Sequence, residues 1–146
     1  MITISKNREA ASTIDRVWDV LSNLNEEQKY WEGLKDVKVL SRNENTIERE
    51  ATISRGPLGN AKSLQTLVLE PKKAVRLTMR KGPMLGTRVI TLSPLGENKT
   101  KIEVAWDFEM KGVPGFALGF VKDNISEGTD KALELIAKKA ERTSLD

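Results

Sequence analysis

The pattern of hydrophobic and polar residues divides the chain into a strand-forming centre between two helical regions. Residues 2–9 alternate apolar and polar side chains, as a short strand does. Residues 17–24 then carry apolar side chains at helical spacing, and Ser12 with Asp15 forms a weak capping box in front of them. A second short helix is predicted over residues 25–31.

From residue 36 to residue 110 the hydrophobic period changes from 3.6 to two, which predicts strands. In the clearest of them, apolar residues occupy the even positions from Ile102 to Phe108, while Glu103, Asp107 and Glu109 lie on the other face. This alternation is typical of an antiparallel sheet that is covered on one side. Short polar turns separate the strands. The predicted strands cover residues 36–43, 46–54, 61–70, 74–81, 86–93 and 99–110.

The chain ends in a long amphipathic segment, which predicts one helix over residues 116–142. At 1.5 Å per residue this helix would be on the order of 35–40 Å long. Seven strands at a spacing of about 4.8 Å are similarly wide. We therefore predict an α+β fold in which a curved, seven-stranded antiparallel sheet wraps around the C-terminal helix, with two short helices between the first two strands. One helix would cover the whole apolar face, and residues 1–146 would form a single domain.

Composition excludes several kinds of chemistry. The chain contains no cysteine and no histidine, so thiol nucleophiles, thiolate metal sites, Ser-His-Asp triads and imidazole ligands are ruled out. Its 24 basic and 21 acidic residues give a net charge of only +3, which does not favour a nucleic-acid partner. The N-terminus lacks the pattern of a signal peptide, so we expect a cytoplasmic protein. The carboxylates of the predicted strands fall on the solvent-exposed face of the sheet. We therefore predict no metal, no cofactor and no catalytic residue.

Two motifs follow the opening strand. Residues 15–21 read Asp-Arg-Val-Trp-Asp-Val-Leu, and residues 31–37 read Trp-Glu-Gly-Leu-Lys-Asp-Val. With the helix at 123–141, they resemble the x-x-V-W-x-x-L and W-x-x-x-x-x-V motifs of the START-like (SRPBCC) superfamily, over essentially the whole chain. This superfamily includes pollen allergens, lipid-transfer domains, polyketide cyclases and dehydrases, and coenzyme-Q-binding proteins. The resemblance implies a helix-grip fold and leaves the function open, because the superfamily combines carriers, enzymes and co-chaperones.

A cavity between sheet and helix is expected because a straight helix cannot fill a coiled sheet along its whole length. Arg49 phases with inward-facing Ile47 and Ala51, and Arg88 with Ile90 and Leu92, so both guanidinium groups are candidate anchors for an acidic or carbonyl oxygen. A register error or a salt bridge at the sheet margin is the alternative. Gly128 is either room for a ligand or a bend or strand contact. The predicted ligand-binding residues are Arg49, Met79, Arg88, Trp106, Phe108, Phe116, Phe120 and Gly128.

Strand parity places three connections at one end of an up-and-down sheet. They combine Gly, Pro and apolar tips, and Arg55, Lys81 or Lys111 precedes each of them. Apolar side chains on loop tips usually contact a protein, a membrane or a ligand. We predict a hydrophobic mouth that also makes transient contact with an anionic membrane surface, unless the tips plug this end of the core. The predicted mouth residues are Leu58, Met84, Leu85 and Val113.

Three functions remain open. The first, which we favour because acid–base groups are absent from the inward-facing strand positions, is binding or carrying of a hydrophobic or amphipathic small molecule such as a lipid, isoprenoid, quinone or polyketide-like compound. The second is an enzyme of the polyketide cyclase or dehydratase type. The third is an interaction module like the co-chaperones. A dry cavity with one cationic anchor would indicate a carrier, whereas a Tyr, Glu or Asp converging with a bound water would favour the enzyme. A filled core without a cavity would leave only the interaction module. The sequence predicts neither the ligand nor the oligomeric state.

Overall fold

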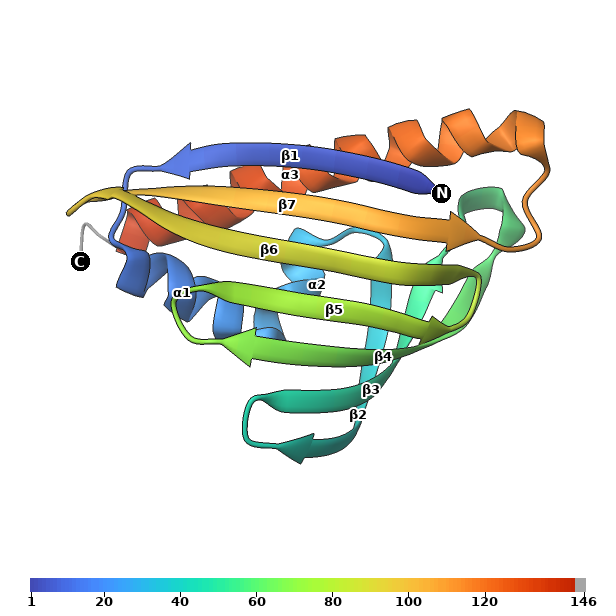
Figure 1. Ribbon diagram of the computed structural model, residues 1–146, viewed down its shortest axis with the longest axis horizontal. Helices are drawn as coiled ribbons and strands as arrows, with labels where there is room; N and C mark the ends of the chain where they lie inside the picture. Colours follow the sequence, from blue (N-terminus) through green and yellow to red (C-terminus); the bar gives the residue numbers. More distant parts are fainter. Residues whose placement is uncertain (144–146) are drawn as a thin grey trace.

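The computed structural model describes residues 1–143 as one seven-stranded antiparallel sheet with helices packed on one face (Figure 1). The strand order is β1-β7-β6-β5-β4-β3-β2, so six consecutive strands form an up-and-down sheet and the first strand pairs with the last. The strands are β1 (Ile2–Ala10), β2 (Leu34–Asn43), β3 (Thr46–Ser54), β4 (Asn60–Glu70), β5 (Ala74–Lys81), β6 (Met84–Gly96) and β7 (Lys99–Met110). The helices are α1 (Ile14–Ser22), α2 (Glu27–Tyr30) and α3 (Leu118–Thr143), with single 3-10 turns η1 (Leu24–Glu26), η2 (Gly56–Leu58) and η3 (Gly115–Ala117).

This architecture confirms the predicted fold class. The period-two segments are strands, the short helices lie between β1 and β2, and the chain ends in a long helix. The predicted cap of α1 is wrong by one residue. Thr13, rather than Ser12, is the N-cap, and its hydroxyl accepts a hydrogen bond from the amide of Arg16 at 3.2 Å. Ser12 is buried and its hydroxyl donates to the carbonyl of Ala140 in α3 at 3.2 Å, so it joins two helices instead.

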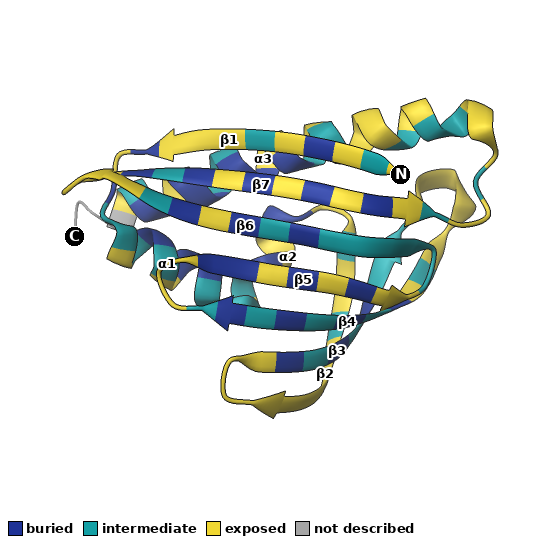
Figure 2. Cartoon of the chain, in the orientation of Figure 1, coloured by how far each residue is buried: buried dark blue, intermediate teal, exposed yellow. Residues whose placement is uncertain are grey.

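The core lies between the inner face of the sheet and the helices. Burial alternates along β4, β5 and β7, as Figure 2 shows, because successive side chains point to opposite faces. Ile102, Val104 and Phe108 are buried on β7, and they meet α1 and the C-terminal half of α3 in one hydrophobic cluster. The charged residues of β7 are exposed on the outer face, as the alternation predicted.

α3 does not cover the whole apolar face, which corrects one expectation. Its fully buried residues begin at Thr129 and continue through Ala132 and Ile136. Its first turns are exposed, and Figure 2 shows this half in yellow and teal beyond the edge of the sheet. The helix runs along β1, at the edge, because a straight rod diverges from a sheet that coils. Among residues 1–143, no helix combines the length and apolar character needed to cross a membrane.

Three connections meet at one end of the sheet, as strand parity predicted (Figure 1). The β7–α3 connection is tied to the β5–β6 turn by a hydrogen bond from the amide of Lys111 to the carbonyl of Pro83 at 2.8 Å. Gly86 lies in the same turn region with φ of +146°, and a Cβ there would lie 2.1 Å from the carbonyl oxygen of Asp107. The backbones of β6 and β7 therefore approach each other more closely than a side chain at this position would allow.

Candidate functional site

A row of polar and aromatic side chains crosses the otherwise apolar inner face of the sheet. Arg49 of β3 lies directly opposite Gln65 of β4, and Arg88 of β6 lies directly opposite Trp106 of β7. Arg49 is 1% exposed and Arg88 is 5% exposed, so both arginines point inward, as their phase predicted. Buried arginines are rare and need partners that compensate for the loss of water.

Glu27 of α2 supplies the counter-charge for Arg49. Its two carboxylate oxygens accept hydrogen bonds from Nη1 of Arg49 at 2.5 Å and from Nη2 at 3.0 Å. Gln65 Oε1 accepts a third hydrogen bond from Nε of Arg49 at 2.9 Å. Glu27 is only 7% exposed, and this bidentate pair is dry. Arg49 is thus fully engaged inside the protein, and we call Glu27, Arg49 and Arg88 the buried charge cluster.

Sequence reasoning missed Glu27 because it searched the strands for inward carboxylates and not the short helices. The signal was present in the spacing. Glu27 follows Leu24 by three residues and precedes Tyr30 by three and Trp31 by four, which puts these side chains on one helical face. Tyr30 and Trp31 are each 8% exposed, so that face is the buried one.

Arg88 carries the unbalanced charge of the cluster. Its Nη2 lies 3.7 Å from Oε2 of Glu27, beyond hydrogen-bond distance, and its buried Nε has no hydrogen-bond partner among residues 1–143. Two guanidinium groups share one carboxylate, which leaves a net positive charge. Burial lowers the pKa of Arg88 to about 10, against an opposing contribution from Glu27, so it remains a cation at neutral pH.

Two tryptophans hold the guanidinium group of Arg88. Its central carbon lies 4.3 Å from the ring centre of Trp31 and 5.6 Å from that of Trp106, and such contacts stabilise a desolvated cation. The two rings meet edge to face at 6.0 Å. The indole N–H of Trp106 donates to the hydroxyl of Thr129 in α3 at 2.9 Å, and that hydroxyl donates to the carbonyl of Ile125 at 2.7 Å. The rings are therefore fixed by both sheet and helix.

A small cavity lies beside Arg88. Its volume is about 20 Å³, and its walls come from α1, η1, α2, β5, β6 and the C-terminal half of α3. Glu27, Tyr30 and Arg88 contribute polar groups, while Leu21, Ile90 and Ile136 are part of its apolar lining. Burial raises the pKa of the Tyr30 hydroxyl, which keeps it protonated at neutral pH. A water molecule needs about 10–15 Å³, so the volume of the cavity is only about that of one water molecule.

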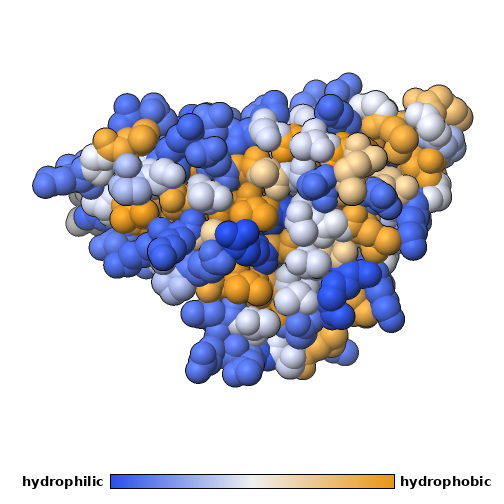
Figure 3. Space-filling model, viewed as in Figure 1, coloured by the Kyte–Doolittle hydropathy of each residue, from blue (hydrophilic) through white to orange (hydrophobic). Residues whose placement is uncertain are grey.

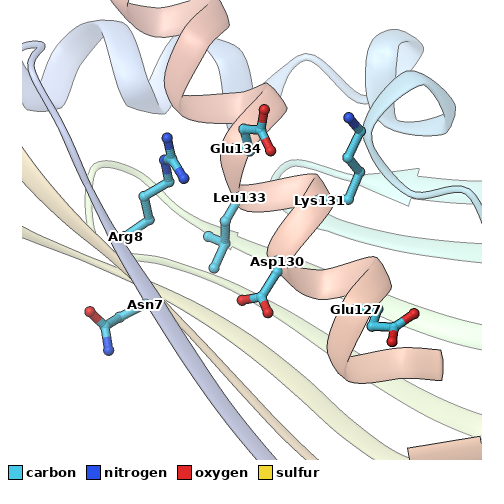
Figure 4. Close-up of a pocket in the computed structure, with 7 residues that line it drawn as sticks. All are labelled: Asn7, Arg8, Glu127, Asp130, Lys131, Leu133 and Glu134. Carbon is cyan, nitrogen blue, oxygen red and sulfur yellow. The ribbon is translucent and has the colours of Figure 1, made fainter. Parts of the chain in front are cut away.

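A second hollow, on the outer surface between β1 and α3, has a different character. It encloses about 370 Å³ and opens widely to solvent, and its lining is mostly charged. Figure 4 shows Arg8 reaching from β1 toward Glu134 of α3 across this groove. No three carboxylates converge there or elsewhere in residues 1–143 as a metal site would require. The groove is not suited to an apolar ligand. It is lined by Asn7, Arg8, Glu127, Asp130, Lys131, Leu133 and Glu134.

The structure brings some of the predicted ligand-binding residues together and separates others. Arg49, Arg88 and Trp106 converge on the buried charge cluster, whereas Met79 and Phe108 are buried in the core. Phe116 and Phe120 are 92% and 64% exposed, so in this conformation they lie on the surface and not in the interior. This departs from the expected cavity lining, because the first half of α3 does not pack on the sheet.

Gly128 faces open space, because a Cβ built there would meet nothing within 4 Å. The structure therefore shows no close strand contact at this position. The predicted mouth residues lie at the loop end: Leu58 is 57% exposed, and Met84, Leu85 and Val113 are partly exposed. None of the four lines the cavity beside Arg88. Ligand binding at Gly128 and ligand exchange at the loop end therefore stay predictions.

Comparison with known proteins identifies the family. The family model described as polyketide cyclase / dehydrase and lipid transport matches residues 1–141. The chain belongs to this family. No curated protein sequence matches it at a significant level.

Several solved structures have a similar fold and match nearly the whole length of this chain. A protein from Thermus thermophilus superposes with a TM-score of 0.82 at 14% identity, covering 98% of this chain and 99% of its own. The Zhui aromatase/cyclase from a Streptomyces species has a TM-score of 0.79 at 14% identity, with 97% and 94% covered. A START superfamily protein from Mycobacterium smegmatis has a TM-score of 0.76 at 17% identity, with 94% and 97% covered. At these identities the likeness shows the fold.

Proposed function

We propose that the protein binds or carries a hydrophobic or amphipathic small molecule that has an acidic or strongly polarised oxygen at one end. The ligand lies between the sheet and the helices, and Arg88 anchors its oxygen. The observation that carries this proposal is the unpaired Nε of a fully buried, unbalanced cation beside a cavity. Membership of a family described by cyclases, dehydrases and lipid transport supports a small-molecule ligand of this kind.

The chemistry of the cluster selects the ligand. A buried donor without an acceptor costs about 1–3 kcal/mol, and a buried charge without a counter-ion costs more. An anionic oxygen placed beside Arg88 would supply both the acceptor and the missing negative charge. Trp31 and Trp106 would present aromatic faces to the apolar part of the ligand. A purely hydrocarbon ligand would leave the Nε unsatisfied.

Ligand access requires movement, because a cavity of about 20 Å³ is too small for an organic molecule. The segment that forms its outer wall is η1 with α2, and α2 is a single helical turn. Its Glu27 already occupies the position of an acid between the two arginines. We infer that an incoming acid displaces Glu27 from the neighbourhood of Arg88 and lifts α2 from the sheet. Ligand exchange would then happen beside Trp31, and not at the loop end for which the sequence suggested it.

Native mass spectrometry of freshly purified protein, followed by extraction and identification of any co-purified molecule, tests this proposal. The wild-type protein should carry an acidic or oxygen-rich amphiphile, and Arg88→Met should lose it while Arg76→Met, on the outer face, retains it. Arg76 is a suitable control because it is exposed and pairs with Glu70. A co-purified hydrocarbon retained equally by all three proteins would contradict the role of Arg88.

Tyr30 and Glu27 favour a second candidate, a polyketide cyclase or dehydratase activity. Both line the same cavity as Arg88, so a carboxylate, a tyrosine and a cation border one small space. Arg88 would stabilise an enolate oxygen, and the protonated hydroxyl of Tyr30 would exchange a proton with the substrate. Tyr30→Phe should then abolish turnover of a poly-β-keto substrate with little effect on its affinity. Unchanged turnover would leave only the carrier.

A further inference from the structure

Three large, exposed hydrophobic side chains lie at one end of the protein. The other exposed ones are at the N-terminus, on β2 and on β6. Leu58 of η2 is 57% exposed, Phe116 of η3 is 92% exposed and Phe120 of α3 is 64% exposed. Phe116 and Phe120 are four residues apart and share one side of the η3–α3 segment. Figure 3 shows hydrophobic side chains on the surface at this end, over the start of α3. Exposed apolar side chains that gather at one place mark an interaction site.

The same end holds the positive charge of the molecule. Residues 55–60, 81–87 and 110–122 form what we call the apolar loop end. These residues include four basic side chains and no carboxylate, while Glu109 and Asp123 flank the last segment on either side. The rest of the chain has 20 basic residues against 21 acidic ones, so the net charge of +3 arises here. Among residues 1–143, no carboxylate forms an ion pair with any of the four. They are Arg55, Lys81, Lys111 and Lys122.

We propose that the apolar loop end docks on an anionic lipid bilayer. Protruding aromatic and aliphatic tips enter the boundary between headgroups and acyl chains, and the unpaired cations face the phosphates and anionic headgroups. The charge is complementary to an anionic surface, and four cations without a single carboxylate would repel a second copy of the same face. The tips lie on two separate connections and on the first turn of α3, so they suit a deformable bilayer better than a flat protein surface.

Co-sedimentation with vesicles tests this proposal with the full-length protein. We expect partitioning onto phosphatidylcholine vesicles to be weak, and to rise at least tenfold when about one third of the lipid is phosphatidylglycerol, at about 0.1 M salt. Raising the salt to about 0.5 M should remove most of this gain, because the cations act through the surface potential. Equal partitioning onto neutral and anionic vesicles would refute the electrostatic part.

Matched variants locate the contact. Phe116→Ser with Phe120→Ser should lower partitioning onto anionic vesicles at least tenfold, whereas Val39→Ser with Leu40→Ser should not change it. The control pair is a fair match because Val39 and Leu40 of β2 are 56% and 51% exposed, at a distance from the loop end. Both double variants should keep the wild-type thermal midpoint, since the replaced side chains are largely exposed.

A charge-matched pair completes the test. Lys111→Gln with Lys122→Gln should weaken partitioning by roughly fivefold for each lysine, on the scale of one cation at an anionic surface. Lys72→Gln with Lys73→Gln removes the same charge from the β4–β5 turn at the opposite end and should have little effect. If both lysine pairs have equal effects, the attraction is only the net charge of the protein and the proposed docking face is wrong. If no vesicle binds while the protein self-associates and the phenylalanine variant abolishes association, the surface is a protein interface and the proposal is wrong.

Discussion

Glu27→Gln is expected to destabilise the fold and to tighten the binding of acids at the same time. The substitution keeps the shape of the side chain and one oxygen acceptor, but it removes the negative charge that Arg49 and Arg88 share. The pair with Arg49 is dry, with side-chain exposures of 2% for Arg49 and 8% for Glu27. Breaking a buried ion pair costs about 3–5 kcal/mol. Because the amide oxygen still accepts one hydrogen bond, we expect about 3 kcal/mol, or a fall in the thermal midpoint of roughly 6–12 °C.

The effect on affinity has the opposite sign. An acid bound beside Arg88 competes with Glu27 for that cation. Two like charges about 4 Å apart at an effective dielectric constant of about 20 repel by about 4 kcal/mol, and structural relaxation removes part of this. A tightening of about tenfold, or 1.4 kcal/mol, is therefore a conservative expectation. Decan-1-ol, which matches decanoate in length but has no charge, should gain little.

The assay combines thermal melts followed by circular dichroism with isothermal titration of decanoate and decan-1-ol. Glu48→Gln is the control, because Glu48 pairs with Arg80 on the outer face at 2.7 Å and is 34% exposed. Its stability should change by less than about 1 kcal/mol, and its affinity for decanoate should stay the same. The reasoning is refuted if Glu27→Gln weakens decanoate binding, or if it tightens decanoate and decan-1-ol equally.

Further predictions concern stability and pH. Arg88→Met should keep or raise the thermal midpoint in melts, because it removes an unbalanced buried charge, and a fall of several degrees would mean that Arg88 has a structural role. The affinity for decanoate, titrated against pH, should be constant from about pH 7 to 9 and fall as the pH rises through 10, because the pKa of folded Arg88 is about 10. Since the unfolded chain keeps that proton to a higher pH, the buried charge should cost stability below pH 10, and this cost should shrink as the pH rises further. Gly128→Ala should stabilise the protein against urea by up to about 1 kcal/mol, because a Cβ has free space there. Gly86→Ala should destabilise it by at least about 3 kcal/mol, because a Cβ has no space there. The opposite order of stabilities would contradict the backbone geometry.

Much of the fold followed from periodicity alone. Segments of period two with one charged face are typical of strands that are covered on one side. This pattern put Arg49 and Arg88 in phase with apolar residues, but a register error or a salt bridge at the sheet margin stayed possible until the structure placed them inward. Strand parity likewise placed three connections at one end. These inferences succeed because the alternation of side chains shows which face of the sheet each residue occupies, and the strand order shows at which end each connection lies. Neither requires any knowledge of distances.

The rest depended on packing in three dimensions. Helical spacing places Glu27 on the same face as Tyr30 and Trp31. Only the structure shows that Glu27 forms an ion pair with Arg49, which lies on a strand 22 residues further along the chain. The apolar stripe of α3 predicted burial along its whole length, whereas the first half diverges from the sheet. The volume beside Arg88 was also beyond prediction, since it depends on how neighbouring side chains fit together.

The central claim is that Arg88 anchors an acidic oxygen inside the protein, and isothermal titration of Arg88→Met tests it most directly. Against wild type, the variant should bind decanoate about 10–150-fold more weakly, which corresponds to the loss of about 1.5–3 kcal/mol from a hydrogen bond to a charged group. Its affinity for decan-1-ol should stay within about twofold of wild type, because the apolar contacts remain. Equal losses for both ligands, or undiminished binding of decanoate, would contradict the anchoring role of Arg88.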